Sequence, residues 1–284
     1  MTLAKDTSGV VYVEFLIAFM PFLVMFLGMV QVALYLTANL VVRHAATTAA
    51  RAAVVVLPDD PQYYDNAEIN RIERGSGGGG GTLEIGGLAI PGGGGSRLDA
   101  IRTAASIPLL AVSPSYEQLV RDSSVARALT GAESRFLTGS TVYNRTAVAV
   151  TFPSSPGDDR YEDRFDSRGR VRTRVTYLFH CGVPVVSRIL CDDYLSLRTG
   201  FPRAAAEDLA AAAASGDTAR FQAAQQRFAH ASNRLAEESP GVDELNEAEM
   251  PYAGIVYSVF GARFRVIRAE AEMTNQGAGF TYED

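Results

Sequence analysis

The longest apolar run of the chain begins just after Gly9. No charged residue interrupts it between Phe15 and Val30, and the stretch 10–38 exceeds the roughly 20 residues that a helix needs to cross a bilayer. A cleaved secretory signal has a shorter apolar core, about 7 to 15 residues long. The run therefore predicts one membrane-spanning helix, kinked at Pro21, because lipid-embedded helices tolerate an internal proline.

The helical pattern continues past the apolar run. Residues 40–57 contain strong helix formers and no glycine, and Pro58 follows as a terminator, so one helix over 10–57 is predicted. Alanine recurs every four residues at Ala45, Ala49 and Ala53, which permits close approach of another segment. The favoured interpretation is that this alanine face lies on the protein's own domain. Packing against a neighbouring subunit is the alternative.

A glycine-rich stretch follows this helix. Residues 75–95 hold 12 glycines in 21 positions, which predicts a flexible linker or a long loop. A phosphate-binding loop would end in Gly-Lys-Ser/Thr or lie between a strand and a helix as GxGxxG, and neither pattern is present. Nucleotide binding is therefore not predicted.

Strand patterns come later in the chain. Short helices are predicted first, over 98–110 and 116–129. Alternation of apolar and polar residues then predicts three half-buried strands, over 145–152, 170–179 and 263–274.

The second and third strands carry complementary charges. Arg172 and Arg174 lie on the polar face of the second strand, and Glu270 and Glu272 of the third are expected to face them. The apolar positions of the third strand change parity, which predicts a β-bulge near Ile267-Arg268. The elements together predict an α+β fold: a long N-terminal transmembrane helix, then a small antiparallel β-sheet domain with added helices.

Composition argues against several classes of function. The formal net charge is −6, so nucleic acid and anionic lipid headgroups are not expected partners. The chain has no HExxH, GxSxG or CxxC motif, and its three histidines, His44, His180 and His230, are scattered. We predict no enzymatic activity, no catalytic residue and no cofactor.

Glu14 is the most unusual residue of the apolar region. A carboxylate in hydrocarbon costs about 2.5 to 3.5 kcal/mol on insertion scales, so Glu14 needs a defined partner. The alternative is an ordinary signal anchor whose Glu14 reaches back to the membrane surface, since it lies only a few residues into the run.

The residues around Glu14 resemble a known family. The run from Gly9 and Val10 to Glu14-Phe15 resembles the prepilin-peptidase motif of type IV pilins, in the Glu-Phe form of Flp pilins and TadE-like pseudopilins. Leu34-Tyr35 and the segment 45–51 are similar to TadE/TadG-like proteins of the tight-adherence pilus. The resemblance implies cleavage after Gly9, with Val10 as the new amino terminus.

The resemblance also implies a role, a location and partners. Glu14 and Phe15 would serve subunit assembly, with the carboxylate neutralising the new ammonium group of a neighbour. The protein would be a single-pass protein of the bacterial inner membrane, with its C-terminal domain in the periplasm. Its partners would be the lipid bilayer, other pilins or pseudopilins, a prepilin peptidase and the inner-membrane assembly platform. Charge alone does not orient it, because Lys5 lies on one side and Arg43 and Arg51 on the other.

A helical hairpin is predicted over 203–214 and 218–238, with Asp217 as N-cap. Its second helix has an apolar stripe, formed by Phe221, Ala224, Phe228, Ala231 and Leu235. Covering the sheet is the favoured use of this stripe. Docking another pilus component is the alternative.

Cys181 and Cys191 are the only cysteines of the chain. In a periplasmic domain they are expected to close a small loop as a disulfide, worth about 2 to 3 kcal/mol. A zinc site with His180 and the neighbouring Asp192-Asp193 is the alternative, but the paired spacing of zinc ligands is missing. The acidic segment 158–166 does not match a calcium-binding loop, and no metal is predicted.

The sequence divides as follows: a leader at 1–9, a transmembrane helix at 10–39, its extramembrane extension at 40–57, a glycine-rich linker at 58–96 and a periplasmic α+β domain at 97–284 with a hairpin inserted at 203–239. The predicted function is a membrane-anchored, pseudopilin-like structural protein that assembles or initiates a tight-adherence or related type IV pilus. The alternative is a signal-anchored periplasmic binding or enzymatic domain that never enters a filament.

Overall fold

The computed structural model describes most of the amino-terminal helix and of the domain that follows it. The described residues are 8–64, 66–72, 82–85, 88–91, 96–114, 143–144, 147–158, 160–199, 201–238 and 262–275. The predicted helix over 116–129 lies outside them.

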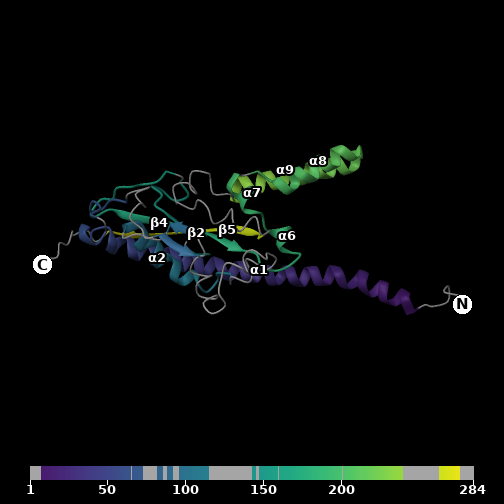
Figure 1. Cartoon of the computed structure of the whole chain (residues 1–284), viewed down its shortest axis with the longest axis horizontal. Helices are drawn as coiled ribbons and strands as arrows, with labels where there is room; N and C mark the ends of the chain where they lie inside the picture. The colour runs from purple at the N-terminus through teal and green to yellow at the C-terminus, as the bar shows by residue number, and fades with distance from the viewer. Residues whose placement is uncertain are drawn as a thin grey trace.

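Helix α1 (Ser8–Val56) is 49 residues long, or about 74 Å at 1.5 Å per residue, and passes through Pro21 (Figure 1). Its second half is part of the domain core, where Ala38, Ala45, Ala49 and Ala53 are fully buried. The hydroxyl of Thr173 donates a hydrogen bond to the carbonyl of Ala46 at 3.3 Å. Small side chains thus let the sheet approach the helix backbone, and the favoured interpretation of the alanine face is confirmed.

The main sheet has three antiparallel strands in the order β3 (Val148–Thr151), β4 (Arg170–His180) and β5 (Phe264–Thr274). It confirms the α+β class. Strands β4 and β5 pair without interruption from Arg170 with Thr274 to His180 with Phe264.

The predicted bulge at Ile267-Arg268 is therefore wrong. The apolar positions change parity because both faces of β5 are covered at its beginning. Ile267 and Ala269 share a face with Thr173, which lies against α1, while Phe264 and Val266 on the other face join the core with Leu235. When both faces of part of a strand are buried, apolar residues occur at both odd and even positions of the sequence there, and the alternation shifts.

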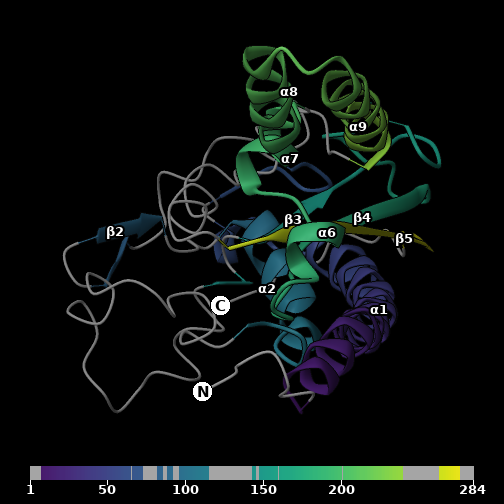
Figure 2. The ribbon, with the colours of Figure 1, turned by 90° about the vertical axis from the view of Figure 1, so that its right-hand side faces the viewer.

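The helices form layers on the two sides of this sheet. Figure 2 shows α1 and α2 (Arg97–Leu109) on one side, and α7 (Tyr194–Thr199), α8 (Arg203–Ser215) and α9 (Thr218–Glu238) on the other. The short helix α6 (Ser187–Leu190) lies near the end of the sheet that faces the N-terminal half of α1 (Figure 1).

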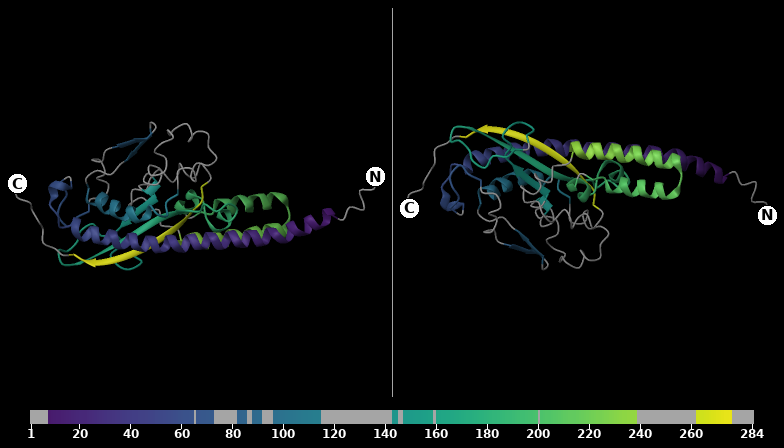
Figure 3. Two further views of the ribbon diagram at one scale, coloured as in Figure 1. Left: turned by 90° about the horizontal axis from the view of Figure 1, so that it is seen from below. Right: turned by 90° about the horizontal axis from the view of Figure 1, so that it is seen from above.

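Helices α8 and α9 form the predicted hairpin. The Asp217 carboxylate accepts hydrogen bonds from the backbone N–H groups of Ala219 and Arg220 at 3.0 and 3.2 Å, so the predicted N-cap is confirmed. Only the far end of the predicted apolar stripe reaches the core, through Leu235. Ala224 is buried in the hairpin, as is Ala212 of α8. Covering of the sheet is thus limited, and the hairpin projects beyond the domain (Figure 3).

A second, two-stranded sheet lies inside the glycine-rich stretch, where β1 (Thr82–Ile85) pairs antiparallel with β2 (Leu88–Pro91). The glycine content of this stretch predicted a flexible linker or a long loop. The glycine runs on either side lie outside the described residues.

Candidate functional site

The first half of α1 is a continuous apolar surface. Large apolar side chains between Tyr12 and Val30 are exposed; they include Phe15, Ile17, Phe22, Phe26 and Met29. The helix is long and apolar enough to cross a membrane. Residues 12–30 span about 28 Å, close to the roughly 30 Å of a bilayer's hydrocarbon core. This half of α1 is a candidate membrane anchor.

The predicted cleavage and assembly residues lie at the start of this helix. Gly9 and Val10 belong to the first turn of α1, which begins at Ser8. Glu14 and Phe15 follow and are both exposed, and the Phe15 ring stacks on Phe19 with 5.4 Å between centroids. Among the described residues, none forms an ion pair with Glu14. The chain thus presents an exposed carboxylate at the beginning of its apolar surface.

Gln31 marks the other end of the uncovered half. It is only 2% exposed, and its side-chain carbonyl accepts a hydrogen bond from the backbone N–H of Val183 at 3.3 Å. Sequence reasoning missed this residue. Its signal was a lone amide between the apolar residues Val30 and Val32, where a polar group needs a partner within the protein.

Val183 belongs to a loop closed by a disulfide. Cys181 and Cys191 are bonded, with 6.5 Å between their Cα atoms. Because both sulfur atoms form the disulfide, neither is a thiolate that could bind zinc, which argues against the zinc site. Val185 and Ile189 on this loop are exposed, and Val185 has φ of 68°, which is uncommon for a β-branched residue.

His180 precedes the loop and packs against Phe264, with 5.9 Å between ring centroids. Burial disfavours the charged imidazolium and lowers the pKa of His180 to about 4. His180 is therefore neutral at physiological pH.

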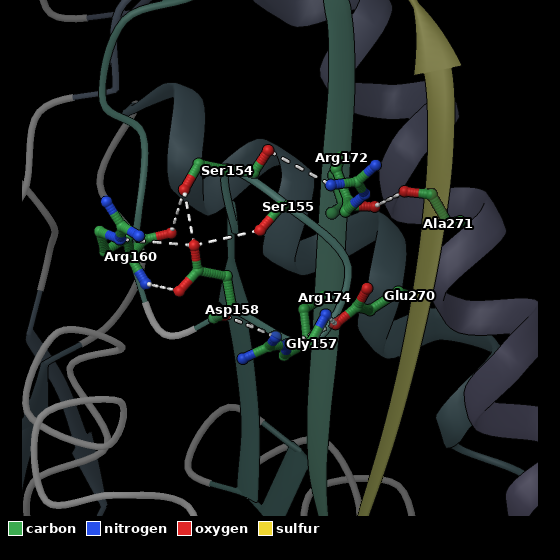
Figure 4. Close-up of polar contacts among 10 residues, drawn as sticks. Ser154, Ser155, Gly157, Asp158, Arg160, Arg172, Arg174, Glu270 and Ala271 are labelled. Atoms are coloured by element: carbon green, nitrogen blue, oxygen red, sulfur yellow. Dashed lines mark hydrogen bonds and ion pairs between the residues drawn. The ribbon is translucent and has the colours of Figure 1, made fainter.

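Two charge pairs join β4 to β5, as predicted, and Figure 4 shows the one between Arg174 and Glu270. The Arg174 guanidinium pairs with Glu270 at 2.8 Å and donates to the carbonyl of Asp158 at 2.7 Å. Arg172 pairs with Glu272 and donates to the carbonyl of Ser154 at 3.3 Å. The hydrogen bond from Arg172 lowers the pKa of Glu272. These arginines hold the loop between β3 and β4 onto the sheet, which is a structural role.

Arg97 closes the carboxyl end of α1. Its side chain is 1% exposed and donates to the carbonyls of Val56, Asp59 (2.9 Å) and Ala67 (3.2 Å). The guanidinium also lies over the ring of Tyr64, 4.7 Å from its centroid. Burial lowers the pKa of Arg97. The sequence offered no signal for this role, because an arginine in the first turn of a helix ordinarily faces solvent.

Comparison with known proteins agrees with this geometry. The chain carries an apolar helix that continues into the core of an α+β domain, and the first half of this helix is a candidate membrane anchor. Residues 9–51 match the model of the family described as TadE-like protein. This segment covers most of α1 and links the chain to Tad pilus-associated proteins, a family that is associated with membranes and not known as enzymatic. No curated protein and no solved structure matches the chain.

Proposed function

We propose that this protein is a membrane-anchored, pseudopilin-like structural component that helps to initiate or assemble a tight-adherence pilus. One observation carries the proposal: the TadE-like match falls on a helix whose first half is apolar, uncovered and headed by the exposed carboxylate of Glu14. An apolar surface of this size requires lipid or other apolar helices around it.

The proposed mechanism begins with removal of residues 1–9 by a prepilin peptidase. Cleavage after Gly9 leaves Val10 as the amino terminus and Glu14 as the fifth residue of the mature chain. The ammonium group of Val10 then enters an apolar environment, where the Glu14 carboxylate of a neighbouring subunit neutralises it. Charge pairing of this kind fixes the stagger between subunits, and Phe15 contributes apolar contact beside it.

The proposed location is the bacterial inner membrane, with the domain in the periplasm. The disulfide between Cys181 and Cys191 supports this orientation, because disulfides persist in oxidising compartments. The proposed partners are other pilins or pseudopilins, the peptidase and the inner-membrane assembly platform.

Two measurements test the proposal in cells that contain a prepilin peptidase. N-terminal sequencing and intact mass of the purified protein are expected to show a chain that begins at Val10. Retention of Met1 or Thr2 favours the alternative, a signal-anchored periplasmic domain that does not enter a filament.

The second measurement replaces Glu14. Glu14→Ala is expected to insert into the membrane as the unchanged protein does, since it removes a charge from the apolar segment, but to lose co-purification with other pilus components. Glu207→Ala, an exposed carboxylate on α8, is the matched control and should co-purify normally. Undiminished assembly of the Glu14 variant would contradict the mechanism.

A further inference from the structure

The α8–α9 hairpin starts at the same end of the sheet as the Gln31 contact. At its base, Arg234 pairs with Asp192 at 2.7 Å, and Asp192 forms a β-bridge with Phe264. Phe264 pairs with His180, the residue before the disulfide loop that contacts Gln31. From this base the hairpin extends in the same direction as the uncovered half of α1 (Figures 1 and 3).

The hairpin is nearly as long as a bilayer is thick. From Thr218 to Arg234, α9 rises by about 25 Å, against about 30 Å for the hydrocarbon core. The sheet lies between α1 and the base of the hairpin, and the rest of the hairpin extends beyond the sheet (Figures 1 and 2). A bilayer extends in its plane far beyond the width of this protein. If residues 12–30 of α1 lie in its hydrocarbon core, the hairpin in its described position lies at the same depth.

The outer surface of the hairpin is unsuited to lipid. Exposed polar side chains lie along α9, among them Arg220, Gln222, Gln226, Arg227 and His230. Charged groups at the depth of the hydrocarbon are expensive unless protein or water surrounds them. The described position of the hairpin and a bilayer around the first half of α1 therefore exclude each other.

We propose that the hairpin is a movable arm. It swings away from the flank of α1 when residues 12–30 lie in the bilayer, and it takes the described position once α1 has left the lipid for an apolar protein environment. This inference rests on the proposed membrane anchor and adds a conformational change to it.

A small set of described contacts attaches the hairpin to the rest of the domain. Its base is held by the Arg234–Asp192 pair, whose side chains are 27% and 18% exposed, by an edge contact between Phe201 and Phe228 and by the burial of Leu235. Helix α1, in contrast, is fixed by fully buried alanines. Bending α1 inside the lipid at a point other than Pro21, which lacks an N–H donor in any case, would break backbone hydrogen bonds where no water replaces them. Tilting the whole molecule by the usual angle of about 20° leaves a parallel hairpin largely at the same depth.

Spin-label distances in the full-length protein test the arm. The two native cysteines are bonded to each other, so introduced cysteines are the free thiols of the chain. Labels are placed in pairs at three exposed positions: Gln222 on the hairpin, Ser167 on the domain and Met25 on the uncovered half of α1. Distances are measured in phosphatidylcholine nanodiscs, and insertion is checked by co-flotation with vesicles of the same lipid.

The distance between residues 222 and 25 is expected to be longer than in the described structure by about 10 Å or more, which is two helical turns. The distance between residues 222 and 167 is expected to be shorter, because the described hairpin points away from the end of the sheet that carries Ser167. The pair of residues 25 and 167 should match the structure. A label at residue 222 should also be accessible to a water-soluble nickel chelate, while one at residue 25 is protected.

Other outcomes overturn the proposal in distinguishable ways. If all three distances match the structure, the molecule tilts as a rigid body and the arm does not move. If the distance between residues 222 and 167 matches but the other two change, α1 bends instead. A chain that fails to float with the vesicles overturns the membrane anchor, and the arm with it.

Discussion

Arg97 shows how one side chain joins three parts of this fold. Its guanidinium binds carbonyls at the end of α1, in the turn after it and at Ala67, although it belongs to α2. The last carbonyls of a helix lack partners within the helix. Five fixed N–H donors on one planar group suit this task, whereas a lysine has a single charged centre.

We expect Arg97→Ala to lower the free energy of unfolding by about 3 kcal/mol, because it removes a charged donor from several buried carbonyls. Arg97→Lys should recover only part of this, since one ammonium group cannot reach all three sites. Urea unfolding followed by circular dichroism checks both. Arg51→Ala, an exposed arginine of α1, is the control and should change stability by less than about 0.5 kcal/mol. Equal effects at Arg97 and Arg51 would contradict the capping role.

His180 predicts a pH dependence of stability. Its pKa falls from 6.5 to about 4 on folding because burial disfavours the charged ring, so the unfolded chain binds the proton more tightly. The contribution of neutral His180 to the free energy of unfolding is fully present above pH 6.5 and is lost as the pH falls toward 4. The loss is at most about 3 kcal/mol, since each pKa unit corresponds to about 1.4 kcal/mol. Urea unfolding between pH 7 and pH 4.5 measures this loss. His180→Phe should flatten the His-dependent part of the curve, while His230→Phe, an exposed control, should not.

At the scale of elements, one arginine of the charge ladder between β4 and β5 is buried. The side chain of Arg174 is 4% exposed and is held by Glu270. Removing Glu270 leaves a buried cation without its carboxylate, and such losses are commonly 3 to 5 kcal/mol. We expect Glu270→Ala to destabilise the domain by about 3 kcal/mol in urea unfolding.

Asp208→Ala is the matched control for that variant. It breaks the pair with Arg227 on the hairpin, where both side chains are more than half exposed, and exposed pairs contribute about 0 to 1 kcal/mol. If both variants lost the same stability, the burial of Arg174 would not be what matters.

The sequence predicted elements well where one local pattern decided them. The apolar run, the alternation in β4 and the N-cap Asp217 are local signals, and each corresponds to the observed element. The prediction from sequence was wrong at β5. Other elements cover both faces of the beginning of this strand, so its apolar residues shift from one face to the other without a bulge. Gln31 and Arg97 were missed because their partners lie 30 or more residues away in the chain, at Val183 and at Val56 and Ala67.

At the scale of the whole molecule, α1 is a candidate anchor in its first half and part of the domain core in its second half. The boundary predicted at residue 57 places the helix and the domain in separate segments. In the structure, the helix residues Ala38, Ala45 and Ala49, together with Leu57, are buried in one core with the sheet. The contact between α1 and the disulfide loop lies at Gln31, just after the apolar surface of residues 12–30. One rigid helix thus transmits any change in the position of the anchor directly to the sheet.

This arrangement predicts how truncations behave. A chain that starts at Val30 keeps Gln31 and the alanine face, so we expect it to fold and unfold cooperatively, with Leu36→Ser and Leu40→Ser added to reduce exposed apolar surface. A chain that starts at Pro58 loses the helix that covers one face of β4 and β5. Burying a large aliphatic side chain is worth about 1.5 to 3 kcal/mol, so exposing that face removes more than the 5 to 15 kcal/mol by which domains are usually stable. Cooperative thermal unfolding of the first fragment and none of the second is the expected result. A cooperative transition from the shorter fragment would show that the domain is independent of its anchor.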